Sequence, residues 1–224
     1  MTLAAVLLDE GGLLAVDKPA GVPVIPGRTQ DGPLPLQQQL ERALGKRLWV
    51  VHRLDRDTSG VLLFATTAAA HRALSMAFEA GRIHKRYLAL VRGTLAAPLD
   101  VDAPLVPARR SRMRVARAGE DGKPARTLVR PVQQLKDATL VEAEPLTGRT
   151  HQLRVHLLSA GHPLLVDHQY GEPGPLSLPG GALLARTPLH AAELELPSLE
   201  GIRAQVIRAP LPTDMAAAVA ALTS

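Results

Sequence analysis

Short apolar runs separated by polar turns dominate the hydrophobic pattern of this chain. Such runs lie at residues 13–17, 48–51 and 61–65, and their length and composition predict buried strands. Apolar and polar side chains alternate in residues 85–91 and 139–145, which predicts half-buried strands. The pattern therefore predicts a sheet of many short strands.

Apolar residues at helical spacing predict helices between these strands. The predicted helices cover residues 36–44, 68–80 and 149–160, and a short Ala-rich helix follows Thr213 and Asp214. Each of the first three is followed by glycine, which favours the left-handed conformation that ends many helices. Together the elements predict an α+β fold: a single domain over residues 1–224, with a mixed, mainly antiparallel sheet and flanking helices.

Composition narrows the class of protein. Hydrophobic residues make up 46% of the chain and charged residues 21%, which is typical of a globular domain. The absence of cysteine excludes disulfides and thiolate nucleophiles. The N-terminus lacks the basic start of a signal peptide, and no apolar run is long enough to span a bilayer. We expect a soluble cytoplasmic protein that binds no membrane, and a monomer by default.

One segment carries the positive charge of the chain. Residues 109–130 have a net charge of +6, while the remainder has −1. We expect a hairpin with a long basic arm at residues 104–126, poorly ordered without a partner because it has few apolar residues to bury. The abundance of arginine favours phosphate binding over a merely solvated loop. The residues expected to bind the phosphates of such a polyanion are Arg109, Arg110, Arg112 and Arg114.

The segment His52-Arg-Leu-Asp-Arg-Asp-Thr-Ser-Gly60 is the strongest candidate for chemistry, because it joins two predicted buried strands. Asp55 has Arg53 and Arg56 beside it, which favours an ionised carboxylate. Such a group serves as nucleophile, general base or metal ligand. The residues alone favour a simpler interpretation, a polar turn stabilised by Arg–Asp pairs.

Other polar residues leave similar alternatives. On the strand at residues 85–91, Leu88 and Leu90 should face the core, which turns Tyr87 toward the polar side as a platform for base stacking or as an ordinary tyrosine at the core edge. His151 and His156 are five residues apart and have no cysteine to assist, so we expect no metal. No glycine-rich nucleotide-binding loop is present, and we expect no cofactor.

Several segments together resemble the RluA family of pseudouridine synthases, over about residues 16–197. The nine residues from His52 to Gly60 resemble its signature loop. Lys18-Pro-Ala-Gly21, Lys85-Arg-Tyr87, Leu146-Thr-Gly-Arg-Thr-His-Gln-Leu-Arg-Val-His156, Asp167-His-Gln-Tyr-Gly171 and Leu189-His-Ala191 resemble further family motifs. The family's common N-terminal S4-type domain has no counterpart in these residues.

The resemblance implies isomerisation of a uridine in RNA to pseudouridine, without metal or cofactor. It makes Asp55 the catalytic nucleophile, which attacks either the ribose C1′ or the uracil C6. It implies that Tyr87 stacks on the target base, that Arg154 pairs with the catalytic carboxylate, and that Leu189 lies beneath the uracil ring. Arg53 would enter the space left by the flipped base.

The resemblance leaves the RNA partner open between stem-loops of ribosomal RNA and transfer RNA, which the basic arm would clasp. Two other functions compete. A non-catalytic RNA-binding module would keep the fold but not need Asp55, Tyr87 and Arg154 together. A carboxylate-dependent nucleoside hydrolase would need a second carboxylate, such as Asp57, and would have no use for the basic arm.

Overall fold

Fourteen strands and four α-helices make up the parts of the computed structural model that are described, residues 4–26, 33–181 and 183–223. The strands are β1 Ala5–Glu10, β2 Leu13–Lys18, β3 Trp49–Val50, β4 Ser59–Ala65, β5 His84–Arg92, β6 Leu99–Asp102, β7 Leu105–Pro107, β8 Met113–Val115, β9 Arg126–Leu135, β10 Ala138–Pro145, β11 Leu176–Ser177, β12 Leu183–Leu184, β13 Leu189–Leu196 and β14 Gln205–Arg208. The helices are α1 Leu36–Leu44, α2 Ala68–Glu79, α3 Gln152–Ser159 and α4 Thr213–Thr223. None of these helices is long and apolar enough to cross a membrane.

The local signals that predicted α1 and α2 are present in the structure. Gly45 follows α1 in the left-handed conformation, and its N–H donates to the carbonyl of Glu41. The Thr67 side chain accepts a hydrogen bond from the N–H of Ala70 and so caps α2. The third helix is shorter than predicted and begins at Gln152, because His151 has a left-handed backbone with φ of 55°.

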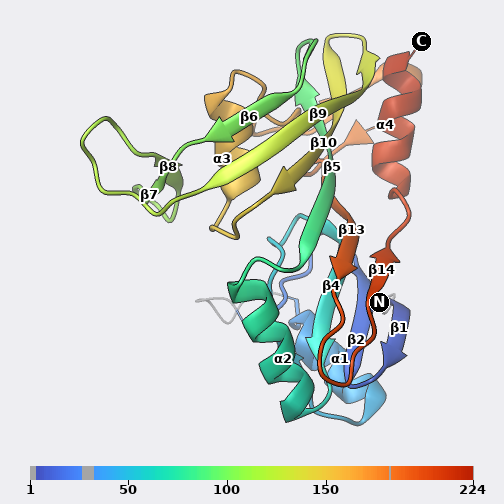
Figure 1. Cartoon of the computed structure of the whole chain (residues 1–224). Helices are drawn as coiled ribbons and strands as arrows, with labels where there is room; N and C mark the ends of the chain where they lie inside the picture. The colour runs from blue at the N-terminus through green and yellow to red at the C-terminus, as the bar shows by residue number, and fades with distance from the viewer. Residues whose placement is uncertain (1–3, 27–32, 182, 224) are drawn as a thin grey trace. The chain divides into compact units, whose positions relative to one another are not determined.

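The chain forms two compact units and passes from one to the other after Lys85, His190 and Pro210 (Figure 1). The first unit contains the described residues up to Lys85 and residues 191–210, and the second contains residues 86–190 and those from Leu211 on. The prediction of a single domain stays a prediction.

The first unit is a sheet in which β4 is the buried centre. Its strand order is β1–β2–β4–β13–β14, with β3 also paired to β4. The pairs β1–β2, β2–β4, β3–β4 and β13–β14 are antiparallel. Every residue of β4 is buried, and Val61 and Leu63 pack with Leu74 of α2. The continuous apolar run therefore predicted this strand correctly.

The second unit has the strand order β5–β10–β9–β6, all paired antiparallel. Ala89 and Val91 of β5 pack with Leu153 and Leu157 of α3. Leu90 of the same strand packs with Met215 of α4. The two faces of this sheet therefore carry different helices, and the predicted α+β class with a mainly antiparallel sheet is confirmed.

This packing corrects the expected environment of Tyr87. Tyr87 lies on the face of β5 that α3 covers, and it packs at the edge of the cluster that contains Ala89 and Leu189. It is partly buried rather than directed to a polar side. The alternation of β5 alone did not reveal that both of its faces are covered.

The basic segment forms a hairpin with a small core, and the prediction that it is poorly ordered without a partner stays a prediction. β6 and β9 pair as expected, and between them β7 pairs antiparallel with β8 (Figure 1). Leu105 of β7 is fully buried with Ala125 and with Val155 of α3, and Met113 packs beside them. The hairpin acquires this small core from residues that lie far away in the sequence.

Candidate active site

The loop that carries Asp55 is fixed from within by Lys18. The Lys18 side chain is fully buried, and its Nζ donates to the carbonyls of Pro19 at 2.9 Å, Arg56 at 2.9 Å and Thr58 at 2.7 Å. Three acceptors match the three N–H bonds of an ammonium, which compensates for the loss of water around a buried charge. The backbone on the C-terminal side of Asp55 is therefore held firmly.

A tight turn then begins at Asp55. The N–H of Thr58 donates to the Asp55 carbonyl at 3.2 Å. The Arg56 Nε donates to the Gly21 carbonyl, and the Gly21 N–H donates to the Arg56 carbonyl, both at 2.9 Å. The turn at Lys18–Gly21 and the turn at Asp55 thus hold each other. The support that Lys18 gives to the Asp55 turn was not predicted from the sequence, although the resemblance of Lys18–Gly21 to a family motif was a signal for it.

His52 supports the other end of the loop as a neutral ring. The N–H of Leu63 donates to its Nε2 at 3.0 Å, which places the ring proton on Nδ1. The ring stacks on Phe78 with 4.6 Å between centroids. Burial and the nearby charge of Lys85 lower the pKa of His52 to about 3, so the ring is uncharged at neutral pH.

Gly60 allows the loop to enter β4. Its φ is +109°, and a Cβ atom at this position would lie 2.2 Å from the carbonyl oxygen of Ala191. Only glycine avoids that overlap with backbone. Within this frame Asp55 is partly buried. Arg53 is exposed, and its side chain forms no hydrogen bond or ion pair with the other described residues.

Arg154 of α3 belongs to the second unit and is almost fully buried, with 8% of its surface exposed. Its Nε and Nη2 donate to the two carboxylate oxygens of Asp167 at 2.8 and 2.7 Å. Nη2 also donates to Oε1 of Gln169 at 3.1 Å. This pairing was not predicted, since the sequence showed Asp167 only as part of a segment that resembles a family motif.

The Asp167 carboxylate has enough donors to remain ionised. Burial raises its pKa, but the hydrogen bonds and charge of Arg154 and the N–H groups of Gln169 and Tyr170 outweigh burial, so its pKa lies below the ordinary value. Arg154 is thereby fixed in place by a buried, bidentate ion pair.

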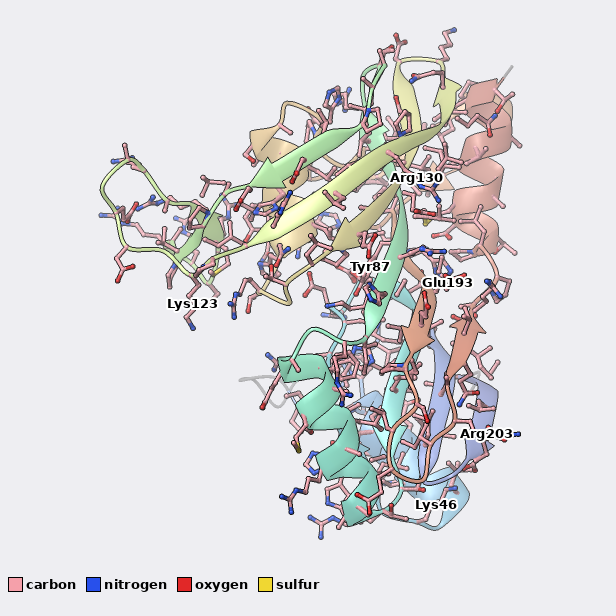
Figure 2. All side chains as sticks on the ribbon, in the orientation of Figure 1. Lys46, Tyr87, Lys123, Arg130, Glu193 and Arg203 are labelled. Carbon is pink, nitrogen blue, oxygen red and sulfur yellow. The ribbon has the colours of Figure 1, made fainter. Side chains whose placement is uncertain are left out.

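Tyr87 and Leu189 belong to one apolar cluster of the second unit (Figure 2 labels Tyr87 on β5). Leu189 is buried, and Tyr87 is partly buried. Their predicted contact with the target base stays a prediction. Asp55 and Arg53 belong to the first unit. The predicted pairing of Arg154 with Asp55 stays a prediction.

His156 of α3 and His151, which directly precedes the helix, both have structural partners. His156 is buried between the Thr127 hydroxyl at 2.8 Å and the Ala103 carbonyl at 3.0 Å, and burial lowers its pKa. His151 Nδ1 lies 2.7 Å from the Tyr170 hydroxyl. In the described part of the chain, no three histidine or carboxylate side chains gather as a metal site.

The basic hairpin separates its arginines into two kinds. Three arginines, Arg109, Arg110 and Arg112, are exposed at the turn between β7 and β8, and their side chains form no hydrogen bond or ion pair within the part of the chain that the structure describes. Arg114 instead forms two hydrogen bonds with Glu120, at 2.7 and 2.6 Å. This pairing, with the N–H of Arg117, lowers the pKa of Glu120 to about 2. Figure 2 shows Lys123 on the same protruding segment.

Comparisons with known proteins bear on the family of this chain. A family model described as RNA pseudouridylate synthase matches residues 12–159. The chain is 40% identical over 97% of its length to ribosomal large subunit pseudouridine synthase D of Nitrosomonas europaea, and 38% identical over 94% to ribosomal large subunit pseudouridine synthase C of Yersinia pestis. It spans 64% and 66% of the lengths of these relatives.

Solved structures show the same fold. The structure of human RNA pseudouridylate synthase domain containing 4 superposes with a TM-score of 0.77 and 26% identity, covering 97% of this chain and 92% of that one. Human RNA pseudouridylate synthase domain containing 1 has the same TM-score, 27% identity, and coverage of 92% and 83%. This chain therefore belongs to the RNA pseudouridylate synthase family, as its resemblance to the RluA family predicted.

Proposed function

We propose that this protein converts uridine to pseudouridine in RNA, with Asp55 as the nucleophile. The observation that carries the proposal is the Asp55 loop, which Lys18, His52 and Gly60 fix in a chain of the RNA pseudouridylate synthase family. A fixed carboxylate needs little reorganisation when it attacks, which is how positioning lowers a barrier.

The proposed reaction is an isomerisation. The C1′–N1 bond of the uridine breaks, the uracil turns, and a C5–C1′ bond forms. C5 loses its hydrogen as a proton, and N1 gains one. Attack of Asp55 on C1′ and attack on C6 both balance in this way, so the proposal includes either route.

The other candidate residues have supporting roles. We propose that Arg154 pairs with Asp55 when RNA is bound, that Tyr87 stacks on the uracil, and that Leu189 lies beneath it. Tyr87 and Leu189 share an apolar cluster, which supports a common contact with one ring. Exposed Arg53 would occupy the gap that an extruded base leaves in the RNA.

Large-subunit ribosomal RNA is the proposed substrate, and the cytoplasm the proposed place of action, since the relatives carry names of ribosomal large subunit synthases. Arg109, Arg110 and Arg112 are proposed to bind its phosphates. Arg114, which pairs with Glu120, is proposed to shape the segment instead.

The test is tritium release from RNA labelled at uridine C5, with wild type, Asp55→Asn and Asp57→Asn. Ribosomal and transfer RNA would come from cells that lack the protein. We expect release from ribosomal RNA with wild type and Asp57→Asn, and none above background with Asp55→Asn. Release of free uracil would instead support a hydrolase, and tight RNA binding without any release would support a non-catalytic module.

A further inference from the structure

The hydroxyl of Tyr170 lies between the basic hairpin and helix α3. The N–H of Met113, in β8, donates to the Tyr170 oxygen at 2.7 Å. Nδ1 of His151, directly before α3, lies 2.7 Å from the same oxygen. All three residues belong to the second unit, so one phenol connects two segments of that unit.

The donors and acceptors around the Tyr170 hydroxyl determine where its proton lies. Because the oxygen accepts the Met113 N–H, its own proton is available to His151 Nδ1, which then leaves the ring proton of a neutral His151 on Nε2. His151 has a left-handed backbone with φ of 55°, a conformation that costs energy for a residue with a Cβ. The bond to Tyr170 helps to hold it there.

The ring of the same tyrosine supports Arg154. The guanidinium carbon of Arg154 lies 4.9 Å from the centre of the Tyr170 ring, within the range of a cation–π contact. Asp167 accepts hydrogen bonds from Arg154 and, at 3.1 Å, from the N–H of Tyr170. The ion pair and the tyrosine therefore fix one another.

Other bonds also join the hairpin region to α3 and the residues before it: the His156 ring bonds with the Ala103 carbonyl, and the Arg149 Nε donates to the Pro124 carbonyl. The hairpin packs on α3 as well. Its small core consists of Leu105, Ala125 and Val155, with Met113, Val115 and Tyr170 packed against it. Tyr170 is thus the residue that contributes its ring to the hairpin core, its ring face to Arg154 and its hydroxyl to the hairpin backbone.

We propose that Tyr170 is a positioning residue that couples the RNA-binding hairpin to Arg154. Its hydroxyl fixes the position of the hairpin relative to α3, and its ring fixes the position of the Arg154 guanidinium. The inference rests on the proposed function, because it assumes that Arg109, Arg110 and Arg112 bind the RNA on which Arg154 acts. It requires that loss of the hydroxyl and loss of the ring affect different kinetic constants.

The test compares Tyr170→Phe with Tyr170→Leu in the tritium-release assay. Tyr170→Phe keeps the ring and removes two hydrogen bonds, so we expect KM for RNA to rise roughly five- to tenfold with kcat within about twofold of wild type. Tyr170→Leu also removes the ring, so kcat should fall as well, by at least about tenfold.

Thr139→Val serves as the control for a general loss of stability. The Thr139 hydroxyl is buried in the same unit and bonds with Gly93, Leu95 and Gln134 instead of the hairpin or α3. We expect this variant to lower the melting temperature about as much as Tyr170→Phe while its KM and kcat stay at the wild-type values. A change in its KM would show that destabilisation alone explains the tyrosine variants and would overturn the proposal.

A second comparison places Tyr170→Phe in a variant whose Arg109, Arg110 and Arg112 are replaced by alanine. If the hydroxyl acts through the hairpin, it has little further effect on KM in this background. An equal rise in KM in both backgrounds would overturn the coupling. If the wild type releases no tritium, the proposed function fails instead. The coupling is then still tested by filter binding, which measures the RNA affinity of the wild type, Tyr170→Phe, the triple arginine variant and the variant that combines all four substitutions.

Discussion

The Asp55 loop of the first unit and the basic hairpin of the second are held by different kinds of contact. Around Asp55 the contacts involve the backbone: the Lys18 ammonium binds carbonyls, and Gly60 passes close to the Ala191 carbonyl. The hairpin instead depends on side chains: its small buried core around Leu105, the Tyr170 hydroxyl, and the exposed pair of Arg114 with Glu120. The loop of the proposed nucleophile is thus held mainly through its backbone, whereas the hairpin is held mainly through side chains.

This comparison predicts where substitutions act. Changes around Asp55 should lower both the free energy of unfolding and kcat. Changes at the exposed arginines of the hairpin should leave the folded state unaltered and change only RNA affinity.

The largest effect is expected for Gly60→Ala. A methyl group 2.2 Å from the Ala191 carbonyl requires the backbone of β4 or β13 to move. We expect a loss of about 4 kcal/mol in the free energy of unfolding, measured by urea denaturation. Gly45→Ala is the matched control, since Gly45 also has positive φ but open space around it, and should cost about 1 kcal/mol. Equal losses in the two variants would remove the argument for close approach.

Lys18→Met should have the next largest effect. Methionine fills similar volume but leaves the buried Thr58 carbonyl without the Lys18 donor, at a cost of about 3 kcal/mol. We also expect kcat to fall about tenfold with KM unchanged, because the Asp55 turn loses its support. Lys46→Met, at an exposed lysine paired with Asp9, should change stability by no more than about 0.5 kcal/mol. A variant at Lys18 with wild-type kcat would argue against a supporting role.

The smallest effect on folding, and a large one on binding, is expected for replacement of Arg109, Arg110 and Arg112 by alanine. These exposed side chains should change stability by less than about 0.5 kcal/mol. The slope of log affinity against log salt concentration should become shallower by about 2 if all three bind phosphates. Arg114→Gln should keep the wild-type slope, because Arg114 pairs with Glu120. An unchanged slope in the triple variant would exclude the hairpin turn as a phosphate site.

Local signals predicted much of the fold. The run at Val61–Phe64, the cap at Thr67 and the glycine after Leu44 each act on neighbouring residues, so β4, α1 and α2 appear where the sequence indicated. The start of α3 was missed because its left-handed His151 is held by Tyr170, 19 residues away.

Contacts between residues far apart in sequence also explain why the roles of Lys18 and Asp167 were not predicted. Lys18 binds carbonyls 38 and 40 residues along the chain, and a lysine beside a proline gives no local sign of burial. Asp167 is as ordinary in sequence as any turn aspartate, until the fold places Arg154 against it. The packing of the hairpin likewise depends on Val155 of α3 and on Tyr170.

The three carbonyls around Lys18 also separate charge from shape. An ammonium directs its three N–H bonds toward the corners of a tetrahedron, and a guanidinium holds five donors in a plane. Exchange of lysine for arginine preserves the net charge of +5 and the isoelectric point near 10, yet at this position it changes the geometry on which the Asp55 turn depends. Lys18, one of the chain's 26 basic residues, therefore joins two turns through the tetrahedral geometry of its ammonium rather than adding to the basic surface.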